Sequence, residues 1–378
     1  MMLPNPLHRK KNPMKPFAPG HIADIIPYPP GKPLEELERE YGIANSIKLA
    51  SNENPLGPSP KAVAAIREAL GNLHRYPDGS GYYLRRRLSE KFAVPFDGIV
   101  LGDGSNEIIE LVTRSFLIPG DEVIVPAPSF LLYEIAVRTM GARAVPVPLK
   151  DCSIDLDAMV EAVTPRTRIV FVNNPNNPTG TVVSKQAFEL FLTKIPKETI
   201  VMLDEAYVEF VRDSDIPHGF DYVDLDGPFV VVLRTFSKIY GLAGLRIGYG
   251  AMAASVADYL NRVRQPFNTG ALSQVAALAA LDDDEFVQST RNVVWEGLRY
   301  LYGEVERMGL EYHPSQANFF LIEVPGNART VFEAMLRQGV IIRAMNSYGM
   351  ENVIRINAGL PEENERFVRS LRQVLNNL

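Results

Sequence analysis

Three near-continuous apolar runs, each ending abruptly in polar residues, constrain the fold of this chain more than any other feature. They occupy residues 168–172, 199–203 and 229–233. Strands of this kind are buried on both faces, as in parallel sheets that helices cover on each side. Further strand patterns at 122–125 and 144–147 alternate with helical patterns, among them 59–70 and 105–117. The sequence therefore predicts an α/β fold built on a large, doubly wound and mainly parallel sheet.

Reactive side chains follow these runs at the points where the strands should end. Asn177 lies in the polar stretch after the first run, Asp204 and Tyr207 follow the second, and Lys238 follows the third. In open parallel sheets, ligands bind outside the carboxyl ends of the strands, so these groups should converge on one crevice. With Arg246 a few residues further on, the sequence predicts a site that contains an amide, a carboxylate, a phenol, an amine and a guanidinium.

Lys238 is the most informative member of this set. Most lysines lie on the surface, and a single lysine at a strand end would more often be structural than catalytic. This lysine, however, stands beside hydroxyl-bearing and small residues and is accompanied by the other polar strand ends. The set matches the needs of pyridoxal phosphate (PLP), which requires a lysine for a Schiff base, an acid for its pyridine nitrogen, and donors for its ring oxygen and phosphate.

Several ordered motifs resemble those of the fold-type I PLP-dependent aminotransferases. They are 177–180, 204–207 and 237–238, the last with Arg246 eight residues beyond Lys238. More narrowly, four segments are similar to the histidinol-phosphate aminotransferases of the class-II family: 26–29, 49–55, 75–78 and 339–343. The resemblance extends from about residue 22 to the C-terminus. It implies the fold-type I architecture with a smaller α+β domain, aminotransferase activity, and pyridoxal 5'-phosphate as the cofactor.

The resemblance gives each polar strand end a role. Lys238 is implied to carry the Schiff base, and Asp204 to pair with the pyridine nitrogen and keep it protonated. Tyr207 joins these two as a catalytic residue, because Tyr207 and Asn177 are implied to hydrogen-bond the ring oxygen of PLP. The phosphate of the cofactor is assigned to three further residues: Thr235, Ser237 and Arg246.

The stretch 102–107 begins like a dinucleotide-binding turn, but Glu107 occupies the place of the third glycine, so that fingerprint fails. Two interpretations stay open on these residues alone. One is an ordinary glycine turn with Ser105 as helix cap, and the other is a phosphate site at the start of a helix, where free N–H groups bind anions. The resemblance favours the phosphate site, formed by Ser105 and Asn106. It also places Phe130 against the face of PLP, where the family more often has tyrosine.

Two arginines in strand-like patterns, Arg343 and Arg355, are expected to lie at the substrate. A guanidinium fork suits a phosphate or a carboxylate. The resemblance implies that both arginines, together with Tyr28, bind the phosphate of histidinol phosphate. Asn52 and Asn177 are counted with them as substrate-binding residues.

Tyr76 matches a family residue that reaches the cofactor phosphate of the partner subunit, which implies a homodimer with a shared active site. The predicted reaction is transamination of histidinol phosphate with 2-oxoglutarate, in histidine biosynthesis. Because the stretch 344–349 varies within the family, two alternatives stay open: an aromatic amino acid (phenylalanine or tyrosine) aminotransferase and a threonine-phosphate decarboxylase. A catalytically silent PLP-binding regulator would require a DNA-binding module, for which the residues before the resemblance are too few.

The chain exceeds the usual size of one domain, so two domains are expected. From about Phe267 the pattern changes to long helices, such as 285–308, and then to a mixture of short strands and helices. The strands are predicted at 318–324, 340–343 and 353–356, and the helices at 330–338 and 362–378. We predict an N-terminal arm and small-domain segment over 1–45, a large PLP-binding domain over 46–266, and a small C-terminal domain over 267–378.

The composition of the chain argues against several classes of binding partner. A net charge of −6 argues against a general nucleic-acid surface, and the basic runs 8–11 and 85–87 are interpreted as a frayed tail and a solvated helix face. The single cysteine suits a reducing compartment, and no metal site is expected. Neither a signal peptide nor a membrane-spanning run is evident. We therefore expect a cytoplasmic enzyme that acts on small molecules and binds neither nucleic acid nor membrane.

Overall fold

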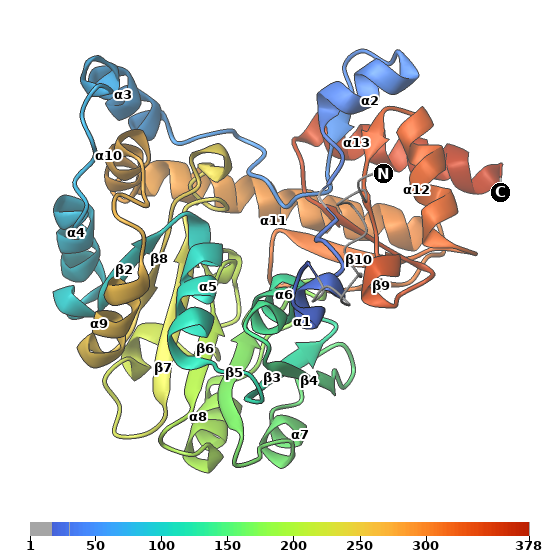
Figure 1. Cartoon of the computed structure of the whole chain (residues 1–378). Helices are drawn as coiled ribbons and strands as arrows, with labels where there is room; N and C mark the ends of the chain where they lie inside the picture. The colour runs from blue at the N-terminus through green and yellow to red at the C-terminus, as the bar shows by residue number, and fades with distance from the viewer. Residues whose placement is uncertain (1–16, 30, 378) are drawn as a thin grey trace, which may run out of the picture.

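The computed structural model describes residues 17–29 and 31–377, and its centre is a seven-stranded sheet (Figure 1). The strand order is β2-β8-β7-β6-β5-β3-β4. The strands are β2 (Ile99–Gly102), β3 (Glu122–Ala127), β4 (Arg143–Pro148), β5 (Thr167–Asn173), β6 (Ile200–Asp204), β7 (Phe229–Thr235) and β8 (Gly248–Ala251). Strand β8 runs antiparallel to both of its neighbours, and the other neighbouring pairs are parallel. The prediction of a large, mainly parallel sheet is confirmed.

Helices cover this sheet on both faces. Ile169 and Phe171 of β5 share a core with α5 (Gly104–Phe116), α6 (Leu132–Thr139) and α9 (Ala254–Val263). Val170 and Val172, which alternate with them and point the other way, share a second core with another set of helices. These are α3 (Pro60–Ala69), α4 (Tyr82–Phe92), α7 (Leu156–Glu161), α8 (Lys185–Lys194) and α10 (Ala271–Ala280). Burial on both faces explains why the strands read as continuous apolar runs.

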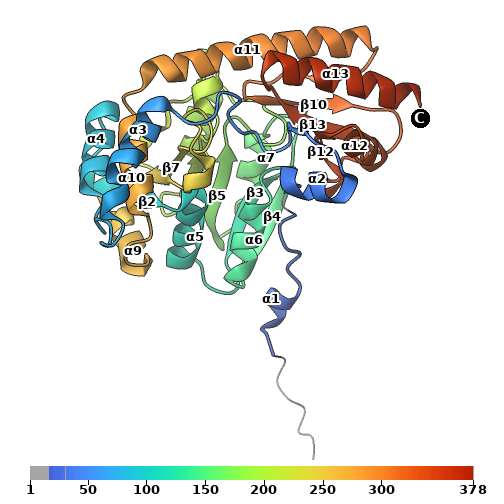
Figure 2. The same cartoon turned by 90° about the horizontal axis from the view of Figure 1, so that it is seen from above.

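We call the sheet and these helices the large lobe, and the second group of elements the small lobe. The small lobe contains an antiparallel sheet in the order β12-β13-β10-β9. Its strands are β9 (Tyr312–His313), β10 (Phe319–Glu323), β12 (Arg343–Ala344) and β13 (Val353–Asn357), and its helices are α2 (Leu34–Tyr41), α12 (Ala328–Arg337) and α13 (Pro361–Asn376). Helix α11 (Asp284–Arg307) runs from one lobe to the other (Figure 2).

The N-terminal segment contributes to both lobes. Helix α1 (Gly20–Ala23) lies beside α6 of the large lobe (Figure 1). Strand β1 (Ile47–Lys48) then pairs in parallel with β11 (Val340–Ile341), next to the small lobe. Helix α10, in contrast, packs on α3 and α4 of the large lobe. The domain division at 45/46 and 266/267 stays a prediction.

One strand prediction is corrected, and some of the observed strands were not predicted. The predicted strand at 340–343 is two strands, β11 and β12, because the chain leaves the pairing with β1 and joins β13 in another sheet. Strands β2 and β8 were not predicted, and β8 contains Gly248 and Gly250. A Cβ on Gly248 would lie 2.5 Å from the Ser105 nitrogen, and one on Gly250 would lie 2.8 Å from Ile108 Cγ2. Glycine therefore allows α5 to lie close against β8.

The surface carries one further correction. Arg85 of the run 85–87 does not lie on a solvated helix face, because its guanidinium donates to the Phe96 carbonyl at 2.8 Å and lies over the Phe96 ring. The basic run 8–11 lies outside the described residues.

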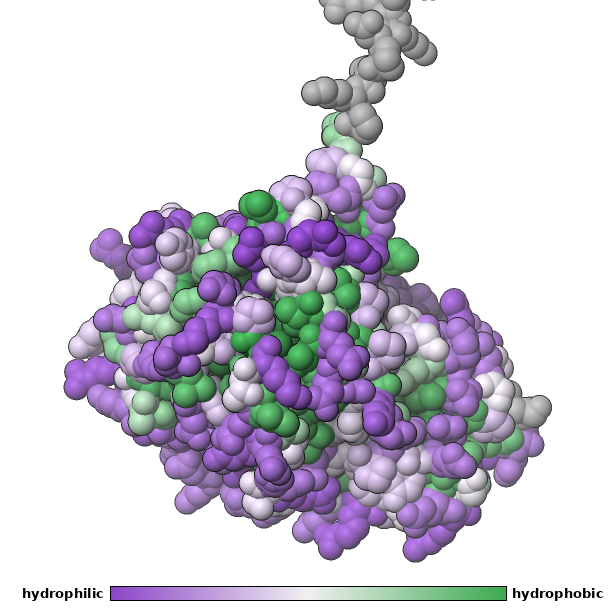
Figure 3. Space-filling model, turned by 90° about the horizontal axis from the view of Figure 1, so that it is seen from below, coloured by the Kyte–Doolittle hydropathy of each residue, from purple (hydrophilic) through white to green (hydrophobic). Residues whose placement is uncertain are grey.

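On the face seen in Figure 3, apolar side chains gather near the middle, with polar side chains around and between them. Within residues 17–29 and 31–377, no helix is both long and apolar enough to cross a membrane.

Candidate active site

A cavity of about 390 Å³ lies where the carboxyl ends of β5, β6 and β7 meet the small lobe. All of the predicted site residues except Tyr76 line it. They are Tyr28, Asn52, Ser105, Asn106, Phe130, Asn177, Asp204, Tyr207, Thr235, Ser237, Lys238, Arg246, Arg343 and Arg355. The convergence expected from the polar strand ends is therefore present, whereas the role of each residue stays a prediction.

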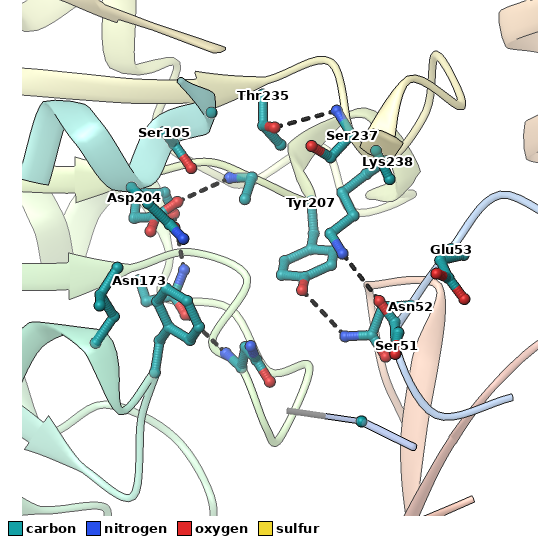
Figure 4. A pocket seen from close by; sticks show the side chains of 18 of the residues that line it. Ser51, Asn52, Glu53, Ser105, Asn173, Asp204, Tyr207, Thr235, Ser237 and Lys238 are labelled. Carbon is teal, nitrogen blue, oxygen red and sulfur yellow. Dashed lines mark hydrogen bonds between the residues drawn. The ribbon is translucent and has the colours of Figure 1, made fainter. Parts of the chain in front are cut away.

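Lys238 extends from the end of β7 across the cavity (Figure 4). Its Nζ donates to the Ser51 carbonyl at 3.1 Å and lies 5.5 Å from the centre of the Tyr207 ring. Burial lowers the pKa of this amine to about 8, and the positive charge of Arg355 acts in the same direction. About a tenth of Lys238 is therefore neutral, and thus nucleophilic, at pH 7, far more than for an ordinary lysine.

Asp204 ends β6 and is almost fully buried. Its Oδ2 accepts from the Tyr133 hydroxyl at 2.6 Å, and its Oδ1 accepts from the Ala206 backbone nitrogen at 3.1 Å. Burial raises the pKa of the carboxyl to about 6, while the two hydrogen bonds oppose that rise. Asp204 is thus an anion at neutral pH in a setting that favours a positive partner.

Tyr207 is held by Asn52, whose side-chain nitrogen donates to the tyrosine hydroxyl oxygen at 3.0 Å (Figure 4). Asn52 has a positive φ of 55°, and its backbone is fixed by two asparagines of the small lobe. Its backbone nitrogen donates to Asn357 Oδ1 at 3.0 Å, and its carbonyl accepts from Asn318 Nδ2 at 3.2 Å. Because the Tyr207 oxygen already accepts from Asn52, its own proton is free to be donated to a ligand.

A polar corner, predicted to hold the cofactor phosphate, forms where α5 begins beside β8. The guanidinium of Arg246 reaches this corner, with Nη1 3.4 Å from Ser237 Oγ. Thr235 Oγ1 accepts from the Ser237 backbone nitrogen at 3.1 Å. The helix begins at Gly104 rather than at Ser105, and Asp103 stands at its cap position, so the cap assigned to Ser105 is wrong. Ser105 lies instead in the first turn, where helical N–H groups are free.

The two predicted substrate arginines differ in their surroundings. Arg355 of β13 is buried, donates to Asn177 Oδ1, and donates to the Ala50 carbonyl at 3.0 Å. Its Nε is buried without a hydrogen-bond partner in the described part of the chain. Arg343 is more open and donates to the Pro29 carbonyl at 3.0 Å, with its guanidinium 6.0 Å from the centre of the Tyr28 ring.

Tyr76 lies outside the cavity of its own chain. Its side chain is 82% exposed, and its ring stacks on Phe267 with the ring centres 4.8 Å apart. It therefore contacts none of the groups that converge on Lys238 within one chain.

Sequence reasoning missed several residues in and around the cavity, and Ser51, Asn173 and Tyr133 are those that hydrogen-bond to predicted site residues. Ser51 gives Lys238 a carbonyl acceptor, and Asn173 Oδ1 accepts from the Asn177 backbone nitrogen at 2.8 Å. Ser51 precedes Asn52, and Asn173 lies four residues before Asn177, so their neighbourhood was a usable signal. Tyr133, the partner of Asp204, had no such signal because it belongs to an apolar helical pattern.

Comparisons with known proteins show which family this chain resembles in sequence and fold. The family described as aminotransferase class I and II matches residues 44–371. The histidinol-phosphate aminotransferase of Moorella thermoacetica is 47% identical over 354 residues, covering 94% of this chain and 92% of that protein. The enzyme of the same description from Desulfotalea psychrophila is 46% identical over 378 residues, 99% of each chain. The crystal structure of histidinol-phosphate aminotransferase from Sinorhizobium meliloti in complex with pyridoxal-5'-phosphate superposes with a TM-score of 0.88 at 26% identity, covering 97% of this chain and 99% of that chain.

Proposed function

The chain belongs to the aminotransferase class I and II family, and we propose that it transfers the amino group of histidinol phosphate to 2-oxoglutarate in histidine biosynthesis. It is a PLP-dependent aminotransferase of fold type I. The identity of the donor rests on one observation of the site: two guanidinium groups, Arg343 and Arg355, line the same cavity as Lys238. The histidinol-phosphate aminotransferases that match nearly the whole chain support the same donor.

The groups in the cavity fit PLP. Lys238 would hold the aldehyde carbon, Asp204 the ring nitrogen, Tyr207 and Asn177 the ring oxygen, and Phe130 one face of the ring. The phosphate would be held by Ser105, Asn106, Thr235, Ser237 and Arg246. Gly104 and Gly248 leave no side chain over the start of α5, so its free N–H groups stay open to a phosphate. When bound, the cofactor supplies an electron-withdrawing ring that stabilises negative charge on the substrate α-carbon.

The residues around the cofactor perform proton chemistry. With a pKa of about 8, the Lys238 amine can lose its proton near neutral pH and then take the proton from the substrate α-carbon. Asp204, with a pKa of about 6, is ionised at the same pH and would keep a proton on the ring nitrogen of the bound cofactor. Tyr207 would donate a hydrogen bond to the ring oxygen, because its own oxygen already accepts from Asn52.

On the substrate side, Arg343, Arg355 and Tyr28 would bind the phosphate of the donor, with Asn52 and Asn177 next to them. Arg355 has an unpaired N–H in a buried setting, so an anionic ligand satisfies a group that is otherwise costly to bury. Arg343 lies against the N-terminal segment and can adjust to the smaller carboxylate of the acceptor. One cavity can thus take a phosphate and a carboxylate in turn.

A donor competition assay tests this proposal. Purified holoenzyme would receive 2-oxoglutarate together with histidinol phosphate, histidinol, phenylalanine or threonine phosphate, and glutamate formation would be measured. We expect histidinol phosphate to have the highest kcat/KM by roughly two orders of magnitude over histidinol, since two charge-assisted hydrogen bonds are worth roughly 1.5–3 kcal/mol each. Equal turnover of phenylalanine would favour an aromatic aminotransferase, and carbon dioxide release from threonine phosphate would favour the decarboxylase.

We also propose a homodimer in which Tyr76 completes the cofactor site of the partner subunit. The exposed position of Tyr76, outside its own cavity, supports a role in another subunit. Mixing Lys238→Ala subunits with Tyr76→Ala subunits should restore activity, because one of the two mixed sites would carry both native residues. Activity that stays absent while the subunits demonstrably exchange would contradict the shared site.

The cytoplasm is the proposed compartment. A chain with one cysteine, partly buried beside His313, suits a reducing environment. Cell fractionation with antibody detection tests this, and recovery of the protein outside the cytoplasmic fraction would contradict it.

A further inference from the structure

Tyr133 is a buried tyrosine in α6 that sequence reasoning did not assign to the site. Its side chain is 1% exposed, and it is absent from the lining of the main cavity. Its hydroxyl donates to Asp204 Oδ2 at 2.6 Å, a short hydrogen bond between two buried side chains. A direct contact with substrate is therefore excluded, and any effect on the reaction must pass through a neighbour.

The ring of Tyr133 is fixed by two aromatic neighbours. It stacks on Phe171 of β5, with the ring centres 4.2 Å apart and the planes 15° from parallel. Phe130, which lines the cavity, meets it edge to face at 5.6 Å. Packing on two sides holds the Tyr133 ring in one orientation. The tyrosine therefore loses little conformational entropy when its hydroxyl forms the hydrogen bond to the Asp204 carboxylate.

Asp204 needs this donor for a physical reason. Its Oδ1 is held by the Ala206 backbone nitrogen, so the Tyr133 hydroxyl supplies the hydrogen bond to the other oxygen. A buried carboxylate that loses a donor protonates more readily, because burial disfavours the charged form. A neutral carboxyl could not hold a proton on the ring nitrogen of PLP by charge.

The direction of the hydrogen bond is fixed. Burial and the charge of Asp204 raise the pKa of the Tyr133 phenol well above its ordinary value, so this group keeps its proton and acts as the donor. The carboxylate can only accept while it is ionised. Tyr133 therefore favours the charged form of Asp204.

We propose that Tyr133 is a positioning residue of this aminotransferase, which holds the Asp204 carboxylate in its charged form and orientation and supports Phe130 from behind. The inference rests on the proposed role of Asp204 at the cofactor ring nitrogen. It adds a residue that acts on the cofactor only through two others, one at the ring nitrogen and one at the ring face.

The test is a double-mutant cycle with Tyr133→Phe and Asp204→Asn. The phenylalanine keeps both ring contacts and removes only the hydroxyl. Tyr222→Phe is the matched control, because Tyr222 is another largely buried phenol that donates to a carboxylate, Glu189 at 3.2 Å, away from the cavity. Three quantities are measured for each protein: the dissociation constant of PLP from the apoprotein, the absorbance spectrum of the bound cofactor, and kcat and KM for the donor.

Tyr133→Phe should weaken PLP binding and lower kcat by about tenfold each, the scale of one hydrogen bond to a charged group. The absorbance spectrum should change, and KM should stay within about twofold, because Tyr133 does not touch the cavity. In the Asp204→Asn background the same substitution should have little further effect on kcat. Tyr222→Phe should leave all three quantities unchanged.

Two outcomes separate the possible failures. If Asp204→Asn is strongly impaired while Tyr133→Phe behaves like Tyr222→Phe, the inference on Tyr133 is wrong and the role of Asp204 stands. If Asp204→Asn itself turns over normally, the proposed role of Asp204 fails, and the inference on Tyr133 fails with it. An unchanged melting temperature of apo Tyr133→Phe would show that a kcat effect does not come from misfolding, and Tyr133→His, which can also donate, should recover part of the loss.

Discussion

The cofactor side and the substrate side of the cavity are built in different ways. On the cofactor side, Asp204 and Lys238 are placed by the ends of adjacent strands of one sheet, β6 and β7; the Asp204 partner Tyr133 is buried, and the Lys238 partner Ser51 is partly buried. On the substrate side, Tyr28, Arg343 and Arg355 come from the N-terminal segment and two short strands of the small lobe. Under the proposed roles, the backbone of the sheet would fix the chemistry, whereas the choice of substrate would depend on segments that lie far apart in the sequence.

Removal of Lys238 should produce the largest effect in the molecule. Lys238→Ala should abolish turnover, because no other amine among the described residues lines the cavity. Borohydride treatment of the native holoenzyme should fix the cofactor to a peptide that contains Lys238, as mass spectrometry can establish. Lys197→Ala, in which an exposed lysine paired with Asp226 is lost, is the control and should behave like the native enzyme. Label on a different lysine would break the assignment of the cofactor side.

Asp204→Asn should come next. The substitution keeps the shape of the side chain and removes its charge, and neutralising a charged orienting group in an active site can cost roughly 10⁴-fold in kcat. We expect a loss of roughly 10³- to 10⁴-fold in steady-state kcat, with PLP still detectable by its absorbance. Asp226→Asn on the surface provides the control. Turnover within a few fold of native would show that Asp204 does not contact the ring nitrogen.

Substitution of the two predicted substrate arginines should have different effects on kcat/KM, because Arg355 is more buried than Arg343. Arg355→Ala should lower kcat/KM by roughly 100-fold for every donor, because it loses buried hydrogen bonds and leaves Asn177 without its partner. Arg343→Ala should lower kcat/KM by roughly tenfold for histidinol phosphate and much less for phenylalanine. Arg329→Ala, which breaks an exposed pair with Glu333 on α12, is the matched control. Equal losses of kcat/KM for Arg343→Ala and Arg355→Ala would contradict the distinction between a buried arginine and an adjustable one.

The smallest effect concerns stability rather than rate. The pKa of Asp204 is about 6 in the folded protein against an ordinary 3.8, so the folded apoprotein binds this proton more tightly than the unfolded chain. Stability is therefore lost as pH rises from about 4 through about 6, by roughly 3 kcal/mol at most. The amide of the Asp204→Asn variant carries no such proton, and the native apoprotein loses about 1.4 kcal/mol between pH 5 and pH 7.5. The melting temperature of the apo variant relative to native should therefore increase by about 2 °C over this range. If the difference in melting temperature between variant and native protein did not change with pH, burial would not raise the pKa of the Asp204 carboxyl.

The sequence made the cofactor side largely predictable. Each apolar run was long enough to be recognised as a strand. A polar residue that directly follows a parallel strand lies at the carboxyl edge of the sheet, where ligands bind. Asp204, Tyr207, Asn177 and Lys238 therefore converge as expected. What could not be predicted was Tyr133, because an apolar helical pattern does not reveal which aromatic ring carries a hydroxyl that meets a buried acid.

The substrate side was less predictable for a topological reason. The predicted strand at 340–343 divides between two sheets, and this division gives Arg343 a different setting from Arg355. The partners of Asn52 are asparagines near the end of the chain, and no local pattern links them. Strand β8 escaped because Gly248 and Gly250, which the packing of α5 requires, lower the strand propensity that a sequence displays.

The hydrogen bond from the Asn52 backbone to Asn357 also constrains the order in which parts of the enzyme can fold during synthesis. These residues are 305 positions apart, and the neighbouring strand β1 pairs with β11, which is also near the end of the chain. At ~5–20 residues per second, the ribosome needs roughly 15 to 60 s to produce the partner after Asn52 itself has been synthesised. The seven strands of the large sheet are complete well before that moment. A nascent chain can therefore finish the strands of its large sheet early, while the segment that holds Tyr207 and accepts from Lys238 is secured only after Asn357 has been synthesised.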